Sequence, residues 1–354
     1  MDKKKSTDRY IAVDCGKFGT KVAIYNSETN HISKFQFRTM MDNGNFLDDA
    51  LERNTFIAEY DGKTYKVGNG ATKEATLETT KTSEIHKVAT LCAIALLVND
   101  GDNVHVAIGC PVKVFEVVEK RIEYKDFILP QGEVTIKLKI KSDAEPITKT
   151  FNIIPTSRFV YPETAGVLYL DMKKYADNTC GIIDIGGLNS NGCQYEDFEI
   201  LHKYSFTNEF GGNNLVSGLS QDLTSAFGAR CSEDYIRKLI RLPLDQRKLV
   251  PNNGNAEIQE KSKNIITEYM IDYVKDIKRS CDAKNWPLEY MDLTFVGGTT
   301  KILENEIKKV FGENIYIPQN PEYANVLGFL RRLCAKELGI TIEINKEEKL
   351  VLNA

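Results

Sequence analysis

The stretch Ile182-Ile183-Asp184-Ile185-Gly186-Gly187-Leu188-Asn189-Ser190 runs from an apolar strand into an aspartate and then into glycines. A second stretch of the same design, Ile11-Ala12-Val13-Asp14-Cys15-Gly16-Lys17-Phe18-Gly19-Thr20-Lys21, lies near the start of the chain. Each is followed by another strand-like run, so each predicts a β-hairpin with an aspartate near its bend. The repeated design predicts a chain of two related halves.

The residue types in these hairpins favour phosphate chemistry. Glycine turns expose backbone N–H groups and allow a ligand to approach closely, which suits an oligophosphate. An aspartate beside each turn can hold the water shell of a divalent metal. If the two hairpins face each other across a cleft, they make one nucleotide site.

The length and charge of the chain limit the possible classes. A chain of 354 residues is long enough for two domains, each with its own core. The formal net charge is −4, whereas broad binding to nucleic acid needs an excess of Lys and Arg. We therefore expect no direct nucleic-acid binding.

The cysteines and apolar runs indicate a cytoplasmic protein. The eight cysteines form no C-x-x-C pair and the four histidines no H-x-x-x-H pair, so we expect free thiols. Residues 1–9 are basic and contain no apolar signal region. The longest apolar run, residues 91–98, is far too short to span a membrane.

The first half of the chain has a recognisable order of elements. The first hairpin leads into a polar region of about residues 32–80, which we interpret as a small inserted subdomain. Within it, Asp61-Gly62 lies between alternating runs and predicts a further hairpin. The other expected elements are a helix over 83–98, a strand over 104–109, a helix over 114–124, and strands over 134–140 and 149–154.

The second half repeats this order. Pro162-Glu163 and the small residues after them predict a helix start at a domain crossing. The elements expected after the second hairpin are helices over 214–227, 257–281 and 301–311, a loop over 251–255 and a strand over 290–296. Hairpins, helices and strands in a duplicated order predict two mixed α/β domains.

Five stretches, which follow one another along the chain in the expected order, resemble the motifs of the actin, Hsp70 and sugar kinase superfamily. They are Asp14–Lys21 and Asp184–Ser190 as phosphate loops, Phe295–Thr300 as the adenosine motif, and Tyr161–Val167 and Glu322–Phe329 as interdomain connections. The resemblance implies an actin-like, ribonuclease H-like fold with two related domains around a nucleotide cleft. Domain I would span residues 1–163, domain II residues 164–322, and residues 323–354 would return to domain I.

Within that superfamily the chain resembles the plasmid-segregating bacterial actins of the ParM type. The resemblance rests on Pro162-Glu163 followed by Ala165-Gly166, on Asp184-Ile185-Gly186-Gly187, on Phe210–Ser217 and on Tyr323–Gly328. It covers nearly the whole chain and is loose between residues 32 and 80. It implies an ATPase that uses ATP and Mg²⁺, with GTP as the alternative nucleotide.

The resemblance also implies roles for single residues. Asp14 and Asp184 would hold Mg²⁺ through water, Lys21 would bind phosphate, and Glu163 would position or deprotonate the attacking water. Nucleotide contacts are implied for Asp14, Gly16, Lys17, Phe18, Gly19, Thr20, Lys21, Asp184, Gly186, Gly187, Leu188, Asn189, Gly211, Gly212, Gly297, Gly298 and Thr299. Two pairs, Lys17-Phe18 and Leu188-Asn189, depart from the small or hydroxylated residues that are common in these loops.

Each motif alone has a plainer interpretation. An aspartate at a strand end is often only a turn former, Glu163 would favour a helix N-terminus, and Gly297-Gly298 would suit packing between a strand and a helix. The matched hairpins and the joint order of the motifs favour the functional interpretation.

Three functions fit the superfamily. The first is a cytoskeletal filament of the protein itself, because a head-to-tail contact that does not close into a ring gives an open polymer. Such a filament would segregate plasmid DNA through a small DNA-binding adaptor on a centromere-like site. The second is a soluble kinase that phosphorylates a sugar or small acid. Such a kinase needs a base that activates the substrate hydroxyl, and we find no candidate for it beyond Glu163. The third, a chaperone-like ATPase, would need a peptide-binding domain after Gly339.

Overall fold

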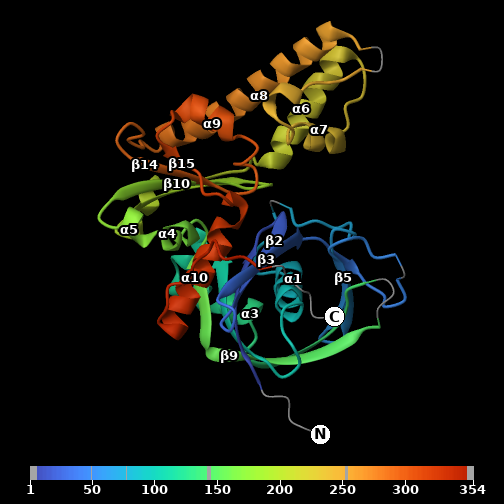
Figure 1. Ribbon diagram of the computed structural model, residues 1–354, viewed down its shortest axis with the longest axis vertical. Coiled ribbons are helices and arrows are strands. Elements are labelled where there is room, and N and C mark those ends of the chain that lie inside the picture. Colours follow the sequence, from blue (N-terminus) through green and yellow to red (C-terminus); the bar gives the residue numbers. More distant parts are fainter. Residues whose placement is uncertain (1–5, 49, 77, 142–144, 252–253, 349–354) are drawn as a thin grey trace. The chain divides into compact units, whose positions relative to one another are not determined.

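The computed structural model describes residues 6–48, 50–76, 78–141, 145–251 and 254–348 (Figure 1). The chain divides into two compact units: unit 1 comprises Met1–Met172 and Tyr323–Ala354, and unit 2 comprises Lys173–Glu322. The sequence placed the first boundary between residues 163 and 164. The units divide later because helix α4 (Gly166–Leu170) packs on helix α10 (Ala324–Leu338) within unit 1.

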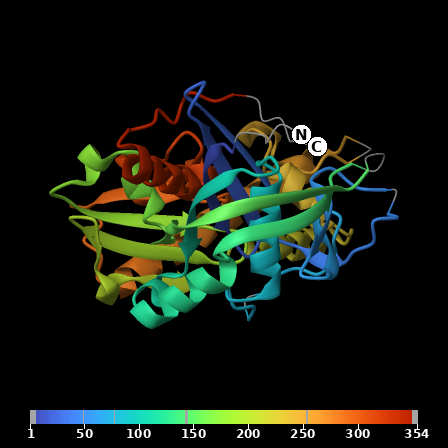
Figure 2. The same cartoon turned by 90° about the horizontal axis from the view of Figure 1, so that it is seen from below.

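Unit 1 is built on one nine-stranded sheet with the order β3-β2-β1-β7-β9-β8-β5-β6-β4. Its strands are β1 Asp8–Cys15, β2 Gly19–Asn26, β3 His31–Arg38, β4 Met41–Asn43, β5 Thr55–Tyr60, β6 Lys63–Gly68, β7 Asn103–Cys110, β8 Gly132–Lys139 and β9 Ile147–Pro162. The pairs β1·β7 and β7·β9 are parallel, and β8 and β9 pair antiparallel as the long adjacent strands of Figure 2.

Strand β1 lies inside the sheet, between β2 and β7, and both of its faces are buried. Ile11 and Val13 pack in a core with helix α1 (Glu84–Ala95), whereas Ala12 packs in a second core with α10. This double burial explains why the strand before Asp14 is continuously apolar. The same burial fixes the position of Asp14 at the end of the strand.

The segment 32–80, predicted as a small inserted subdomain, lies within this sheet. Strand β3 pairs along its whole length with β2, and β5 joins the opposite end of the sheet through β8. The single helix predicted over residues 114–124 is two helices, α2 (Val112–Phe115) and α3 (Val118–Ile128). Val117 between them is extended, as β-branched residues favour.

Unit 2 has a six-stranded sheet that is covered by helices. Its strands are β10 Thr179–Ile185, β11 Ser190–Glu196, β12 Glu199–Ile200, β13 Phe206–Asn208, β14 Asp292–Val296 and β15 Ile315–Tyr316. Its helices are α5 Met172–Tyr175, which begins at the boundary, α6 Gly212–Phe227, α7 Glu233–Leu239, α8 Ala256–Ala283 and α9 Glu304–Phe311. Residues 252–253 of the predicted loop 251–255 lie outside the described residues.

The core of unit 2 explains the periodicity of its long helices. Met270 and Ile277 of α8 pack with Leu219 of α6 and with Ile183 and Phe295 of the sheet. Across the described ranges of both units, we find no helix of the length and apolarity that crossing a membrane requires. The mixed α/β class predicted from the sequence is confirmed.

Candidate functional site

The two hairpins that opened the sequence analysis have the same backbone geometry. Asp14 pairs with Lys21 across β1 and β2, and Asp184 pairs with Asn191 across β10 and β11. Each hairpin then closes in a four-residue turn, in which the first residue's N–H donates to the fourth residue's carbonyl. The N···O distance is 3.1 Å from Gly16 to Gly19 in unit 1. In unit 2, the matching distance from Gly186 to Asn189 is 3.0 Å.

Asp14 lies almost fully buried at the mouth of the first turn and forms an ion pair. The Nζ atom of Lys21 lies 3.2 Å from its Oδ2 atom, and both residues belong to unit 1. The carboxylate has further lone pairs, and carboxylate oxygens are ligands that Mg²⁺ and its water shell prefer. An acidic and a basic group are thus adjacent beside the turn, as a site for a metal–phosphate complex requires.

The first turn is held by Arg38 at the end of β3 and by Thr39 after it. The guanidinium of Arg38 lies over the ring of Phe18 at 3.8 Å, and its Nε donates to the Phe18 carbonyl at 3.1 Å. Thr39 donates its hydroxyl to the Gly16 carbonyl at 2.6 Å. The bulky Phe18, one of the residues at which the sequence departs from the pattern it resembles, therefore anchors the turn.

Thr20 has its side chain in the core. Its hydroxyl is fully buried and lies 2.9 Å from the Thr39 hydroxyl and 3.3 Å from the Cys15 sulfur. The side chain therefore points into the protein, and only the backbone of Thr20 is placed to meet a phosphate.

Glu163 lies at the end of β9, where the backbone is tightly fixed. Its N–H donates to the carbonyl of Cys110 at 2.8 Å. The next residue, Thr164, has φ = 79°, a conformation that costs a β-branched residue energy and is concentrated at functional sites. The hydroxyl of Thr164 donates to the Glu163 carbonyl, which supports this backbone conformation.

Lys81, which the sequence analysis did not single out, contacts two segments that contain predicted site residues. Its ammonium donates to the Glu163 carboxylate and, at 2.9 Å, to the carbonyl of Cys15 at the start of the first turn. Burial lowers the pKa of Lys81, but the charges of Glu163 and Asp14 outweigh it and raise the pKa above its ordinary value. Lys81 therefore carries a positive charge beside the two predicted acids. The position of Lys81 before α1 gave no sequence signal, because its partner lies far away in the sequence.

In unit 2 the second turn is locked against the N-terminus of α6. The carbonyls of Gly186 and Gly187 accept from the N–H groups of Gly212 at 2.9 Å and Asn213 at 2.8 Å. A Cβ atom at Gly211 would lie 2.6 Å from the Gly187 carbonyl carbon. The glycines at 211 and 187 thus allow two backbone segments to meet directly.

The predicted adenosine motif contacts the same turn. Thr299 donates its hydroxyl to the Gly186 carbonyl at 3.0 Å and its N–H to the Ile185 carbonyl at 3.1 Å. Gly297 is buried with φ = 97°, and a Cβ atom there would collide with Oδ1 of Asp184. Gly298 is exposed, with no atom within 4 Å of an added Cβ among the described residues.

The predicted residues fall into two sets, one in each unit. Unit 1 gathers Glu163 and the turn residues Asp14, Gly16, Lys17, Phe18, Gly19, Thr20 and Lys21; unit 2 gathers Asp184, Gly186, Gly187, Leu188, Asn189, Gly211, Gly212, Gly297, Gly298 and Thr299. Over the described ranges, no three His, Cys, Asp or Glu side chains cluster to hold a metal directly. That both sets bind one nucleotide remains the prediction of the sequence.

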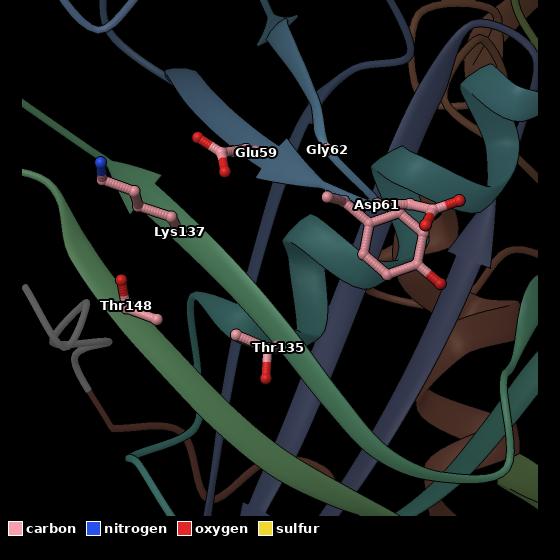
Figure 3. A pocket seen from close by; sticks show the side chains of 7 residues that line it. Glu59, Asp61, Gly62, Thr135, Lys137 and Thr148 are labelled. Carbon is pink, nitrogen blue, oxygen red and sulfur yellow. The ribbon is translucent and has the colours of Figure 1, made fainter.

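A cavity of about 430 Å³ lies elsewhere in unit 1, beside the β5–β6 hairpin and strand β8 (Figure 3). Glu59 and Asp61 line it from the β5–β6 hairpin, and Thr135 and Lys137 line it from β8. It contains none of the residues predicted to bind the nucleotide. We assign it no role in phosphate chemistry.

Residues 12–160 match the family described as the N-terminal domain of actin-like proteins. No curated protein matches the chain. Among solved structures, the Alp12 filament structure is 24% identical, with a TM-score of 0.69 over 94% of this chain and 99% of that chain.

Two ParM structures are also similar. A 15-stranded ParM filament from Clostridium botulinum is 17% identical, with a TM-score of 0.68 over 92% of this chain and 99% of that one. ParM from Bacillus thuringiensis with ATP is 15% identical, with a TM-score of 0.68 over 94% of this chain and 100% of that one. The likeness therefore covers nearly the whole of each chain.

Proposed function

We propose that this chain, which has the actin-like fold, binds ATP with Mg²⁺, hydrolyses it and polymerises into dynamic filaments. The comparisons establish the fold, because the similar structures share 24% or less of their sequence with this chain. The nucleotide, the hydrolysis and the filament are inferred from the residues of the two turns and from the kind of structures that the chain resembles.

The observation that carries the proposal is the pair of matched turns. Each has an aspartate at the end of a buried strand and a four-residue loop, and one turn has Lys21 beside its aspartate. A turn with exposed N–H groups and a neighbouring cation binds phosphate oxygens, and an adjacent carboxylate suits a hydrated divalent metal. The same arrangement in both units favours a ligand with several phosphates.

The chemical step follows from Glu163. Its carboxylate would accept a hydrogen bond from the attacking water and orient its oxygen toward the terminal phosphorus of ATP. The water oxygen would bond to that phosphorus and the water would pass a proton to the Glu163 carboxylate, while the bond from the phosphorus to the bridging oxygen breaks; ADP and phosphate result. Asp14 and Asp184 would hold Mg²⁺ through its water shell, where the ion neutralises charge on the phosphate oxygens.

The biological role that we propose is plasmid DNA segregation in the cytoplasm. Filament structures of Alp12 and ParM support self-association of this chain as the first step. The net charge of −4 supports attachment to DNA through a small DNA-binding adaptor, because an acidic chain attracts no phosphate backbone.

The test is nucleotide-dependent assembly of the purified full chain. We expect light scattering and pelleting to rise with ATP and Mg²⁺ at micromolar protein, and phosphate release to accompany or follow assembly. Parallel samples with ADP, with GTP, and with ATP and a chelator identify the nucleotide and the metal requirement. No assembly under any of these conditions, together with phosphorylation of an added sugar, would show that the chain is a kinase of the same superfamily.

A further inference from the structure

We infer that Lys81 is a positioning residue that holds the Glu163 carboxylate in place for the hydrolytic step. The inference rests on the proposed function and adds to it a residue outside the recognised motifs. Lys81 lies in the segment before α1, and its ammonium connects two parts of unit 1 that the sequence analysis treated separately. These are the first phosphate turn and the end of β9.

The contacts of the ammonium define this link. It donates to the Oε1 atom of Glu163 and to the carbonyl oxygen of Cys15, the residue between Asp14 and Gly16. The side chains of Lys81 and Glu163 are only 9% and 17% exposed, so water competes weakly for either group. One cation thus fixes the carboxylate relative to the backbone of the turn.

Glu163 needs such a partner because the contacts that fix its backbone do not fix its carboxylate. The backbone is fixed by the Cys110 carbonyl and by the strained Thr164. Among the described residues, Lys81 holds the side chain through an ion pair with its carboxylate. Without it the carboxylate would sample several rotamers, and few of these would place an oxygen against the attacking water.

Lys81 is itself well placed to act as a rigid support. It precedes α1 by only a few residues, and α1 is buried along most of its length between the sheet and its neighbours. Ser83, which caps α1, bonds through its hydroxyl to Nδ1 of His86 at 2.9 Å. Burial of the helix therefore fixes the segment that carries Lys81.

Phosphate release by the full chain with ATP and Mg²⁺ tests the inference in four proteins: the unchanged chain, Lys81→Gln, Glu163→Gln and the double variant. We expect Lys81→Gln to slow phosphate release by up to about 100-fold, as for a misplaced catalytic group, with unchanged affinity for ATP. In the Glu163→Gln background, the Lys81 substitution should cause no further slowing. Lys87→Gln, on α1 but over the rings of Tyr60 and Phe127, is the matched control and should keep the full rate.

The outcomes separate the inference from the proposed function. Full activity of Lys81→Gln beside a slow Glu163→Gln overturns the role of Lys81 alone. Equal slowing by Lys81→Gln in both backgrounds also overturns it, because a structural defect acts whether or not Glu163 is present. Full activity of Glu163→Gln contradicts the proposed role of Glu163 before Lys81 is considered.

A second variant protects the test against misfolding. Thermal unfolding of each protein shows whether Lys81→Gln is folded at the assay temperature. If it is not, Lys81→Arg provides the same comparison, since it keeps the charge but changes the geometry. We expect Lys81→Arg to slow release in the unchanged background and to have no effect in the Glu163→Gln background; slowing in both would overturn the inference.

Discussion

Gly297 packs directly against the Asp184 carboxylate, at the point where two parallel strands of unit 2 end. Asp184 of β10 pairs with Val296 of β14, so the residue after Val296 turns across the carboxylate. A Cβ atom at position 297 would collide with Oδ1 of Asp184 and would lie 2.5 Å from the Ile185 carbonyl oxygen. The backbone at Gly297, with φ = 97°, also favours glycine.

We therefore expect Gly297→Ala to impair metal-dependent nucleotide binding. The added methyl group would displace the carboxylate predicted to hold the hydrated Mg²⁺, and the left-handed backbone would add roughly 1–3 kcal/mol of strain. Titration of ATP at several Mg²⁺ concentrations should show weaker binding and a higher Mg²⁺ requirement. Unfolding in denaturant should show a lower free energy of unfolding.

Gly298→Ala provides the matched control for this prediction. The next glycine is exposed, its φ lies outside the left-handed region, and among the described residues no atom lies within 4 Å of an added Cβ. Its free energy of unfolding should match that of the unchanged protein. If Gly298→Ala raises the Mg²⁺ requirement as much as Gly297→Ala does, the contact between Gly297 and Asp184 is not the cause.

Glu163→Gln should slow hydrolysis and leave nucleotide binding and assembly intact. Glutamine keeps an oxygen that can accept from Lys81 but loses the basicity of the carboxylate. Help from a general base is typically worth about 100- to 10,000-fold, and we expect a decrease of this size in single-turnover phosphate release. Loss of ATP binding in this variant would mean that Glu163 contacts the nucleotide rather than the water.

The elements that could be predicted from the sequence are those formed by interactions between residues close together in the chain. The strands before Asp14 and Asp184 were predictable because a strand buried on both faces needs a continuous apolar run. The long helix α8 was predictable from its periodicity, and the observed bounds differ from the prediction by at most two residues. These signals are local, so one segment of sequence contains them.

The features that the sequence did not show depend on distant partners. Lys81 acquires its place from Glu163 and Cys15, and nothing around position 81 records those contacts. The resemblance implied that Thr20 contacts the nucleotide, but its hydroxyl is buried against the hydroxyl of Thr39, which lies between β3 and β4. The boundary of unit 1 depends on α10, which returns from the end of the chain to cover α4.

Gly328→Ala should destabilise unit 1. In the contact between α10 and α4, an added Cβ at position 328 would overlap the carbonyl of Gly166 and lie 2.9 Å from its Cα atom. Both opposing groups are backbone, so a side-chain rotation cannot relieve the clash. Overpacking of this kind costs about 1–3 kcal/mol, to be measured by denaturant unfolding.

A second substitution checks the cause of that effect. Gly166→Ala adds a methyl group to the same contact from the other side, where it would meet the backbone of Asn325. Either variant alone should separate the two helices, so the double variant should lose less stability than the sum of the single losses. Strict additivity would show that the two glycines act independently.

The stability of unit 1 should fall in mild acid because of His86. This side chain is fully buried at the start of α1. Burial, with the charges of Lys81 and Lys17, lowers its pKa from 6.5 to about 3. Below pH 6.5 the unfolded chain therefore binds a proton that the folded protein does not, so the free energy of unfolding falls as the pH falls. The loss should approach about 1.4 kcal/mol per pH unit until the pH nears the folded-state pKa.

Comparison of variants isolates this contribution from the other titrating groups. Denaturant unfolding of the unchanged protein and of His86→Gln between pH 7 and pH 5 should give a shallower dependence on pH for the variant, because glutamine takes up no proton. A parallel pH dependence for the two proteins would mean that His86 is solvated or charged in the folded state, and that the charge of Lys81 does not lower its pKa.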